Sequence, residues 1–336
     1  MAHEALLYEK EEQNYIRCGL CANLCRIAPN ARGICGVREN RAGILYSLVY
    51  GKTIAEHVDP IEKKPLFHVM PGSLTFSIAT AGCNFRCSFC QNSEISQIPR
   101  EKAEIVGRSR TPAQIVEMAR QTKSRSISYT YTEPTIFLEF ALDTAKIAAV
   151  SGLKNIFVTN GFMTSETLKL LSPYLHAANV DLKSFRDDFY RKYCGGHLQP
   201  VLDSLRTMKE LGIWVEVTTL LIPGQNDGDR ELDDIAAFVA SLGRETPWHI
   251  SRFHPQYLMT DTPATSLSAI HQAVETGKSA GLKHVYSGNL PGDSGENTFC
   301  PGCGHLLIGR YGFSIERNDL LGSACPACGA LLDGIF

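Results

Sequence analysis

The sequence contains no uninterrupted apolar run that approaches the roughly 20 residues of a membrane-spanning helix. Residues 1–16 carry charges throughout and lack the apolar core of a secretory signal peptide. An excess of one charge is also missing, because 33 basic and 35 acidic side chains leave a net charge of −2. These absences predict a cytoplasmic protein with no membrane partner. The overall charge does not indicate nucleic acid as a partner, and such binding would need a local basic groove.

The chain also lacks short repeats, low-complexity tracts and long linkers. Its 336 residues are 44% hydrophobic and 20% charged, which suits one large α/β domain or two smaller domains. Cysteine is the residue that stands out, since all but one of the 12 cysteines fall into three tight groups. In a long chain without an export signal, such groups are typical of metal or redox sites rather than of disulfides.

The middle group has the most informative spacing. Cys83, Cys87 and Cys90 follow a buried strand expected at residues 74–78 and form a C-x3-C-x2-C pattern. Three thiolates on a four-iron cluster leave one iron open to an outside ligand, and an open position marks a reactive metal site. We therefore predict a [4Fe–4S] cluster here and assign the three cysteines a catalytic role. The alternative is a zinc loop whose fourth ligand comes from elsewhere in the chain.

The last group consists of two C-P-x-C-G knuckles, which contain Cys300, Cys303, Cys325 and Cys328. The glycine after each pair permits the tight turn by which thiolates converge, and four thiolates complete a tetrahedral shell. This pattern is typical of a zinc ribbon or a rubredoxin-like segment. Because a closed shell suits stability better than chemistry, we expect structural zinc rather than redox iron.

The first group places four cysteines within 18 residues: Cys18, Cys21, Cys25 and Cys35. They could hold zinc or a second iron–sulfur cluster, and at this stage structural zinc is slightly favoured. Cys194 stands alone, and a lone thiol is more often a small buried hydrophobe than a ligand.

From residue 74 to about residue 290 the sequence alternates strand-like and helix-like segments. Runs of β-branched and aromatic residues predict strands at 74–78, 126–131, 155–159, 178–182, 213–221 and 248–253. Helical spacing of apolar residues predicts helices at 111–123, 135–151, 164–171, 199–211, 228–242 and 263–280. Such βαβ units predict an α/β fold with a partial (βα)6 barrel over residues 73–292. Residues 1–72 and 293–336 would form small N-terminal and C-terminal cysteine-rich metal-binding segments.

Polar residues cluster where the predicted strands end, which is where barrel enzymes place their chemistry. The clusters lie at residues 131–134, 159–161, 181–183 and 252–255. Each alone would be an ordinary turn or helix cap, but together with the cysteine loop they indicate an active site. His254 could be a proton donor or a ligand, and a structural histidine satisfied by hydrogen bonds is an equally good interpretation.

These motifs resemble those of the radical S-adenosylmethionine (SAM) superfamily, in particular of enzymes similar to the pyruvate formate-lyase activating enzyme. In that family SAM chelates the open iron, and its reductive cleavage yields a 5′-deoxyadenosyl radical. The family's adenine-proximal aromatic, its Gly-Gly-Glu-Pro stretch and its motifs after strands three and four have counterparts here. The glycines of that stretch are replaced by Tyr131 and Thr132. The resemblance implies that six side chains bind SAM or steer radical transfer: Phe89, Thr132, Glu133, Asn160, Asp181 and Lys183.

A closer resemblance is to the radical SAM member of the set called AmmeMemoRadiSam. It rests on residues 50–73, which include the run Val-Asp-Pro-Ile-Glu-Lys-Lys-Pro-Leu-Phe-His, and on residues 90–97. It covers residues 15–290 and implies Memo-type and Ammecr-type protein partners. The radical SAM chemistry implies flavodoxin or ferredoxin as the electron donor. Two interpretations stay open for residues 59–68, a hairpin packed under the barrel and a substrate-facing segment.

The leading hypothesis is therefore a radical SAM enzyme that cleaves SAM reductively at the cluster and abstracts hydrogen from a substrate at the barrel mouth. The substrate would be a glycyl-radical enzyme, or a small molecule, protein or RNA that is modified. The alternative is a non-catalytic zinc or metal-binding protein that uses its cysteine knuckles for macromolecular recognition. The net charge of −2 and the lack of a basic–aromatic run around residues 300–328 weigh against this alternative.

Overall fold

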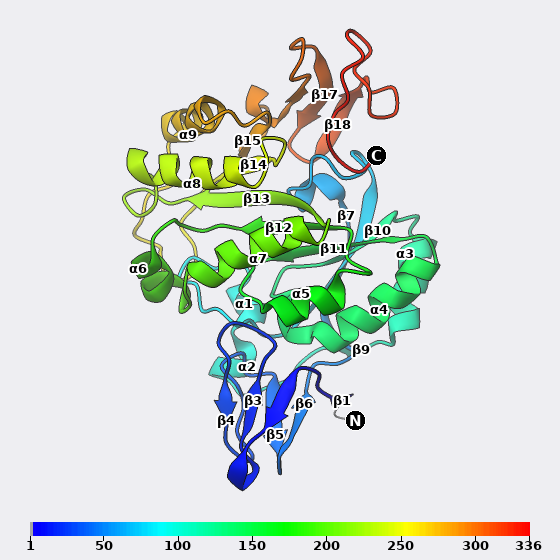
Figure 1. Cartoon of the computed structure of the whole chain (residues 1–336), viewed down its shortest axis with the longest axis vertical. Coiled ribbons are helices and arrows are strands. Elements are labelled where there is room, and N and C mark those ends of the chain that lie inside the picture. Colours follow the sequence, from blue (N-terminus) through cyan, green and yellow to red (C-terminus); the bar gives the residue numbers. More distant parts are fainter. Residues whose placement is uncertain (1–2) are drawn as a thin grey trace.

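The structure is a computed structural model that describes residues 3–336. Its centre is a nine-stranded sheet in the order β15-β14-β13-β12-β11-β10-β8-β7-β9 (Figure 1). The antiparallel strands β7 (Lys52–Pro60) and β9 (Arg108–Ser109) extend one edge. The others run parallel: β8 (Leu74–Thr80), β10 (Ser126–Tyr129), β11 (Lys154–Thr159), β12 (Ala177–Asp181), β13 (Trp214–Leu221), β14 (Trp248–Arg252) and β15 (Val285–Gly288). The order is open, as in the predicted partial barrel, but β15 is one parallel strand more than predicted.

Six helices alternate with the parallel strands and match the predicted helical segments: α3 (Pro112–Gln121), α4 (Leu138–Val150), α5 (Ser165–Leu171), α7 (Gln199–Glu210), α8 (Asp229–Ser241) and α9 (Leu267–Ser279). The start of α3 follows from its sequence, because Thr111 and Gln114 form a reciprocal capping box and Pro112 occupies the first turn. Shorter helical pieces are α1 (Ser93–Ser96), α2 (Ile98–Glu101), α6 (Asp187–Phe189) and the π-helical turn η4 (Tyr190–Cys194). No described helix is long and apolar enough to cross a bilayer.

Small antiparallel sheets form the two ends of the molecule in Figure 1. The N-terminal end contains two of them, β1 (His3–Glu4) with β6 (Ile44–Ser47) and β5 (Arg38–Arg41), and β2 (Tyr8–Lys10) with β3 (Ile16–Cys18) and β4 (Arg26–Ile27). The C-terminal end contains β16 (Thr298–Phe299), β17 (Leu306–Tyr311) and β18 (Ser314–Asn318). Division of the chain at residues 72 and 292 stays a prediction, and β7, although it precedes residue 72, belongs to the central sheet.

The chain between β7 and β8 closes the amino-terminal end of the parallel strands. After the short turn η2 (Ile61–Lys63), Leu66 packs with Ile156 and Ala177 at the starts of β11 and β12. Glu216, near the start of β13, accepts hydrogen bonds from the amide of His68 at 2.9 Å and from the preceding amide at 3.0 Å. The opposite, carboxyl-terminal end of the strands is left for the site.

Candidate active site

A pocket of about 480 Å³ opens at the carboxyl ends of the parallel strands. Its lining includes all nine side chains that the sequence assigns to the cluster and to SAM: Cys83, Cys87, Phe89, Cys90, Thr132, Glu133, Asn160, Asp181 and Lys183. They follow β8, β10, β11 and β12, whose carboxyl ends meet at one edge of the sheet. The structure therefore brings together every residue predicted for this site, while the role of each one stays a prediction.

The loop after β8 takes its shape from its backbone. Gly82 has a φ of +106°, and a Cβ at this position would lie 2.7 Å from the side chain of Val37. Only glycine fits such a turn without strain. Farther along, the amide of Arg86 donates to the carbonyl of Cys194 at 2.8 Å, so the loop is fixed to η4. These contacts turn the cysteine side chains toward one pocket.

The three thiols of the loop have different surroundings. Burial and then the nearby Glu133 carboxylate raise the pKa of Cys83 well above its usual value, and burial raises the pKa of Cys90. A hydrogen bond with Cys194 lowers the pKa of Cys87 although its burial opposes this. Among the described residues, the pocket lining has no fourth cysteine and no histidine. A set of three thiols in the pocket lining fits a [4Fe–4S] cluster that keeps one iron for an outside ligand.

Glu133 is fully buried and is already bound within the protein. Its Oε1 accepts from the amide and the hydroxyl of Thr135 (3.0 and 2.6 Å) and from the Thr159 hydroxyl (2.7 Å). Its Oε2 accepts from the Asn160 amide at 2.9 Å. Since a carboxylate has about four acceptor positions, these bonds use most of its capacity. Glu133 thus ties the loop after β10 to the end of β11, while Thr132 donates to the last carbonyl of β8 at 2.8 Å.

Asn160 and the Asp181–Lys183 pair form the adjoining wall. Asn160 Nδ2 donates to Asn84 Oδ1 at 2.7 Å, directly beside the cysteine loop. Lys183 Nζ lies 2.7 Å from an Asp181 carboxylate oxygen and 5.7 Å from the centre of the Phe89 ring. Burial opposes the charge of Lys183, but Asp181 and nearby thiols raise its pKa well above its ordinary value. The wall therefore presents the Asp181–Lys183 ion pair and an aromatic ring to the pocket.

Comparison with known proteins agrees with this geometry. The family model described as "Radical SAM superfamily" matches residues 77–236. An uncharacterized protein of Methanocaldococcus jannaschii, MJ0808, is 48% identical over 333 residues, which cover 98% of each chain. The chain belongs to the radical SAM superfamily. It is an enzyme of this family, and not the non-catalytic metal-binding protein of the alternative hypothesis.

More distant relatives of this radical SAM chain include an activating enzyme and several GTP 3′,8-cyclases. The pyruvate formate-lyase-activating enzyme of Streptococcus mutans is 23% identical over 195 residues, which cover 55% of this chain and 72% of the relative. The chain also matches GTP 3′,8-cyclases, of which it spans about half the length. The Listeria welshimeri enzyme is 27% identical over 168 residues, which cover 47% of this chain and 48% of the relative. The structure of Streptococcus suis SuiB bound to S-adenosylmethionine has 12% identity and a TM-score of 0.53 over 72% of this chain and 56% of SuiB. At that identity it shows the fold alone.

The pocket of this radical SAM enzyme is also lined by residues that the sequence did not assign to the site. Lys63, Lys64 and Pro65 line it, whereas the next residues of that segment bind Glu216 beneath the strands. Residues 59–68 therefore pack beneath the strands and also reach the pocket, although Asp59, Glu62 and Lys64 are buried and not solvated as expected for a surface hairpin. A substrate-facing role stays a prediction. Phe313, between β17 and β18, lines the pocket from the C-terminal sheet. No local pattern marks Phe313, because its position depends on a contact distant in sequence.

Two residues that the sequence left undecided lie outside the pocket lining. His254 is exposed, and it does not contact the pocket in the part of the chain that the structure describes. Cys194 is fully buried, as expected for a lone thiol, but it lies next to Cys87. The sequence could not reveal this neighbour, because η4 and the cysteine loop are far apart along the chain.

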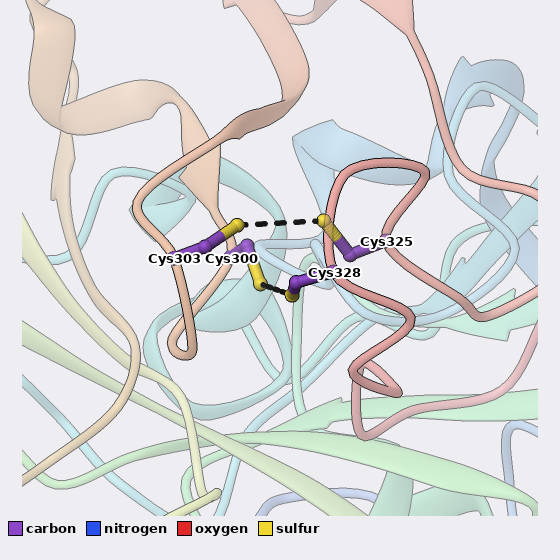
Figure 2. Close-up of side chains that lie close together, drawn as sticks. All are labelled: Cys300, Cys303, Cys325 and Cys328. Carbon is purple, nitrogen blue, oxygen red and sulfur yellow. Dashed lines mark hydrogen bonds between the residues drawn. The ribbon is translucent and has the colours of Figure 1, made fainter.

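The C-terminal cysteines converge on one point (Figure 2). Sγ of Cys300 lies 3.6 Å from Sγ of Cys328, and Sγ of Cys303 lies 3.7 Å from Sγ of Cys325. All four sulfurs lie within 4.8 Å of one another and could hold a metal ion. A tetrahedral shell with metal–sulfur bonds of about 2.3 Å has sulfur–sulfur edges of about 3.8 Å, which agrees with this arrangement.

Proposed function

We propose that this enzyme cleaves SAM reductively at a [4Fe–4S] cluster held by Cys83, Cys87 and Cys90, and abstracts hydrogen from a substrate bound in the same pocket. The observation that carries the proposal is the meeting of three thiols and six predicted SAM contacts in one pocket. When bound, the cluster and SAM supply the electron transfer and the 5′-deoxyadenosyl radical. The protein supplies position, charge and shelter from water.

The side chains of the wall have separate tasks in this proposal. Phe89 offers a buried aromatic surface against which a purine ring can pack. Lys183 offers a cation of fixed charge for a carboxylate group. Glu133 acts through Asn160, whose amide it fixes at the edge of the cysteine loop. Glu133 is therefore a positioning residue. It holds Asn160 in the place from which Asn160 would contact SAM.

The test is formation of 5′-deoxyadenosine by anaerobically reconstituted protein with SAM and dithionite, measured by mass spectrometry. We expect product from the native chain and its loss, by at least about 10³-fold, in Cys87→Ala, because two thiolates no longer hold a site-differentiated cluster. Ser88→Ala in the same loop is the matched control, since the buried Ser88 hydroxyl has no hydrogen-bond partner among the described residues. Native protein that carries iron and sulfide but forms no 5′-deoxyadenosine would overturn the proposal.

We further propose that the chain is the radical SAM member of the AmmeMemoRadiSam set, with Memo-type and Ammecr-type proteins as partners and flavodoxin or ferredoxin as electron donor. Support comes from residues 50–73, whose Lys63–Pro65 portion reaches the pocket. A cytoplasmic location is part of this proposal. The test is co-purification with recombinant Memo-type and Ammecr-type proteins from the same genome. Retention of either one by the tagged chain, but not by a tagged unrelated activating enzyme, supports it, and retention of neither contradicts it.

We infer that zinc is the metal of Cys300, Cys303, Cys325 and Cys328. The closed set of four thiolates and the sulfur spacing of 3.6 and 3.7 Å support a mononuclear tetrahedral site. The segment buries little apolar surface of its own, with a core of five side chains of which two are ligand cysteines. A metal is thus an expected source of its stability.

A further inference from the structure

The three cysteine groups differ in how closely their sulfurs approach. Within residues 3–336, the C-terminal group is the one place where three or more Cys, His, Asp or Glu ligand atoms lie within 4.8 Å of one another. Among Cys18, Cys21, Cys25 and Cys35, no three sulfurs meet this limit together. The three sulfurs of the loop at Cys83, where the proposed function places a [4Fe–4S] cluster, do not meet it together either. In spacing, the N-terminal group resembles the cluster loop and differs from the mononuclear site.

The N-terminal sulfurs nevertheless share one buried space. Cys18, Cys21 and Cys35 are buried, and Cys25 is half-buried. Buried thiols grouped in this way are suited to a metal, which neutralises the charge of their thiolates.

Arg38 supplies independent evidence for negative charge at this place. Its side chain is 1% exposed, and Nη2 donates to the carbonyl of Leu6 and pairs with Glu139 at 3.0 Å. Its Nε and Nη1 are buried without an acceptor among residues 3–336. After Glu139, the acidic groups that interact most strongly with the Arg38 charge are the thiols of Cys18, Cys35 and Cys21. Two unpaired buried donors are costly, and an anionic metal–thiolate group beside them would offset that cost.

The N-terminal sheets lie beside α1 and α2, the helices that follow the loop of Cys83, Cys87 and Cys90 (Figure 1). Arg100 in α2 uses its Nη2 to donate both to the Ile34 carbonyl at 2.9 Å and to the Cys83 carbonyl at 3.1 Å. Asn23 Nδ2 donates to the Asn84 carbonyl at 3.2 Å. Arg100 thus bridges Ile34, the neighbour of Cys35, to Cys83, and Asn23 bonds directly to the cysteine loop. The two groups are therefore connected through hydrogen bonds rather than separated by the sheet.

We infer that Cys18, Cys21, Cys25 and Cys35 hold a second iron–sulfur cluster of the four-iron type, which relays electrons to the site of Cys83, Cys87 and Cys90. The relay role rests on the proposed function, whereas occupancy by iron does not. One electron leaves a low-potential donor of the flavodoxin or ferredoxin class and reduces the N-terminal cluster. The electron then moves to the cluster at Cys83, Cys87 and Cys90. No bond or proton changes until that electron reaches the pocket. This replaces the zinc that the sequence slightly favoured.

The test is the metal content of anaerobically reconstituted full chains, together with their EPR spectra after dithionite reduction. We expect about eight irons and one zinc in the native chain, because each cluster contributes about four irons. The triple variant Cys83→Ala, Cys87→Ala, Cys90→Ala should keep about four irons and a reduced-cluster signal that SAM does not change. The double variant Cys18→Ala, Cys21→Ala should keep about four irons and a signal that SAM does change.

Two zincs and no iron in the triple variant would overturn the inference. If the double variant fails to fold, the EPR spectrum of the native chain is sufficient. Two clusters give two reduced-cluster signals, and SAM changes one of them. A single signal would contradict the inference. The relay is tested by stopped-flow reduction of the loop cluster. The double variant should be reduced by flavodoxin at least about tenfold more slowly than the native chain, and equal rates would contradict a relay. Native chain with eight irons and no 5′-deoxyadenosine would contradict the proposed function and leave the second cluster standing.

Discussion

At the scale of single residues, Asp59 connects separate parts of the pocket wall. Its Oδ1 accepts from Lys63 Nζ at 2.9 Å, and its Oδ2 accepts from Lys64 Nζ at 2.7 Å and from the Tyr131 hydroxyl. Burial alone would raise the pKa of Asp59, but the three donors hold it well below its usual value. Burial lowers the pKa of Lys64 to about 8, because Asp59 offsets only part of the cost of burying the ammonium.

Lys64→Met is therefore expected to destabilise the fold by about 1–3 kcal/mol at pH 7, because the buried Asp59 carboxylate loses its closest cation but keeps Lys63 and the Tyr131 hydroxyl. Lys63→Met is the matched control. The Lys63 side chain is 43% exposed, so its ion pair is worth about 0–1 kcal/mol. Urea unfolding followed by fluorescence of the two tryptophans measures both variants. Equal losses in the two variants would show that burial of Lys64 does not matter.

The same carboxylate predicts a pH dependence. A carboxyl whose folded pKa is lowered stabilises the protein fully above the ordinary value of 3.8, and this contribution is lost as the pH falls through the folded value. Removal of Lys64 weakens the lowering, so the stability difference between native and Lys64→Met chains should shrink below about pH 4. A difference that stays constant from pH 7 to pH 3 contradicts this assignment.

At the scale of elements, local chemistry determined what could be predicted. Apolar periodicity and caps such as Thr111 with Pro112 are local signals, and they identified six parallel strands and the main helices. β15 was missed because Val285–Gly288 is only four residues long and ends in glycine, which leaves too little pattern. Asn160 and Asp181 could be predicted because carboxyl ends of parallel strands share an edge. Lys64 and Phe313 could not, since they reach the pocket through contacts between distant parts of the chain.

At the scale of the whole molecule, the C-terminal sheet closes onto the segment that follows β7. Arg310 in β17 is buried, donates from Nη2 to the Phe67 carbonyl at 3.0 Å and covers the Phe67 ring at 4.1 Å. The last turn of the chain adds a hydrogen bond from the amide of Met70 to the carbonyl of Ile335 at 2.6 Å. With Phe313 in the pocket lining, the C-terminal sheet is a part of the pocket wall.

Loss of the C-terminal metal should therefore loosen the pocket as well as the C-terminal sheet. In Cys303→Ser, Cys328→Ser we expect faster amide hydrogen exchange over residues 298–333 and also over residues 66–70, with unchanged protection in β10 to β12. The physical reason is that the Arg310 bonds, about 1.5–3 kcal/mol each for a charged donor, need a folded β17. Ser323→Ala lies in the same loop and keeps all four thiolates, so it should behave as the native chain. Faster exchange confined to residues 298–333 would show that the C-terminal sheet folds independently and does not hold the pocket wall in place.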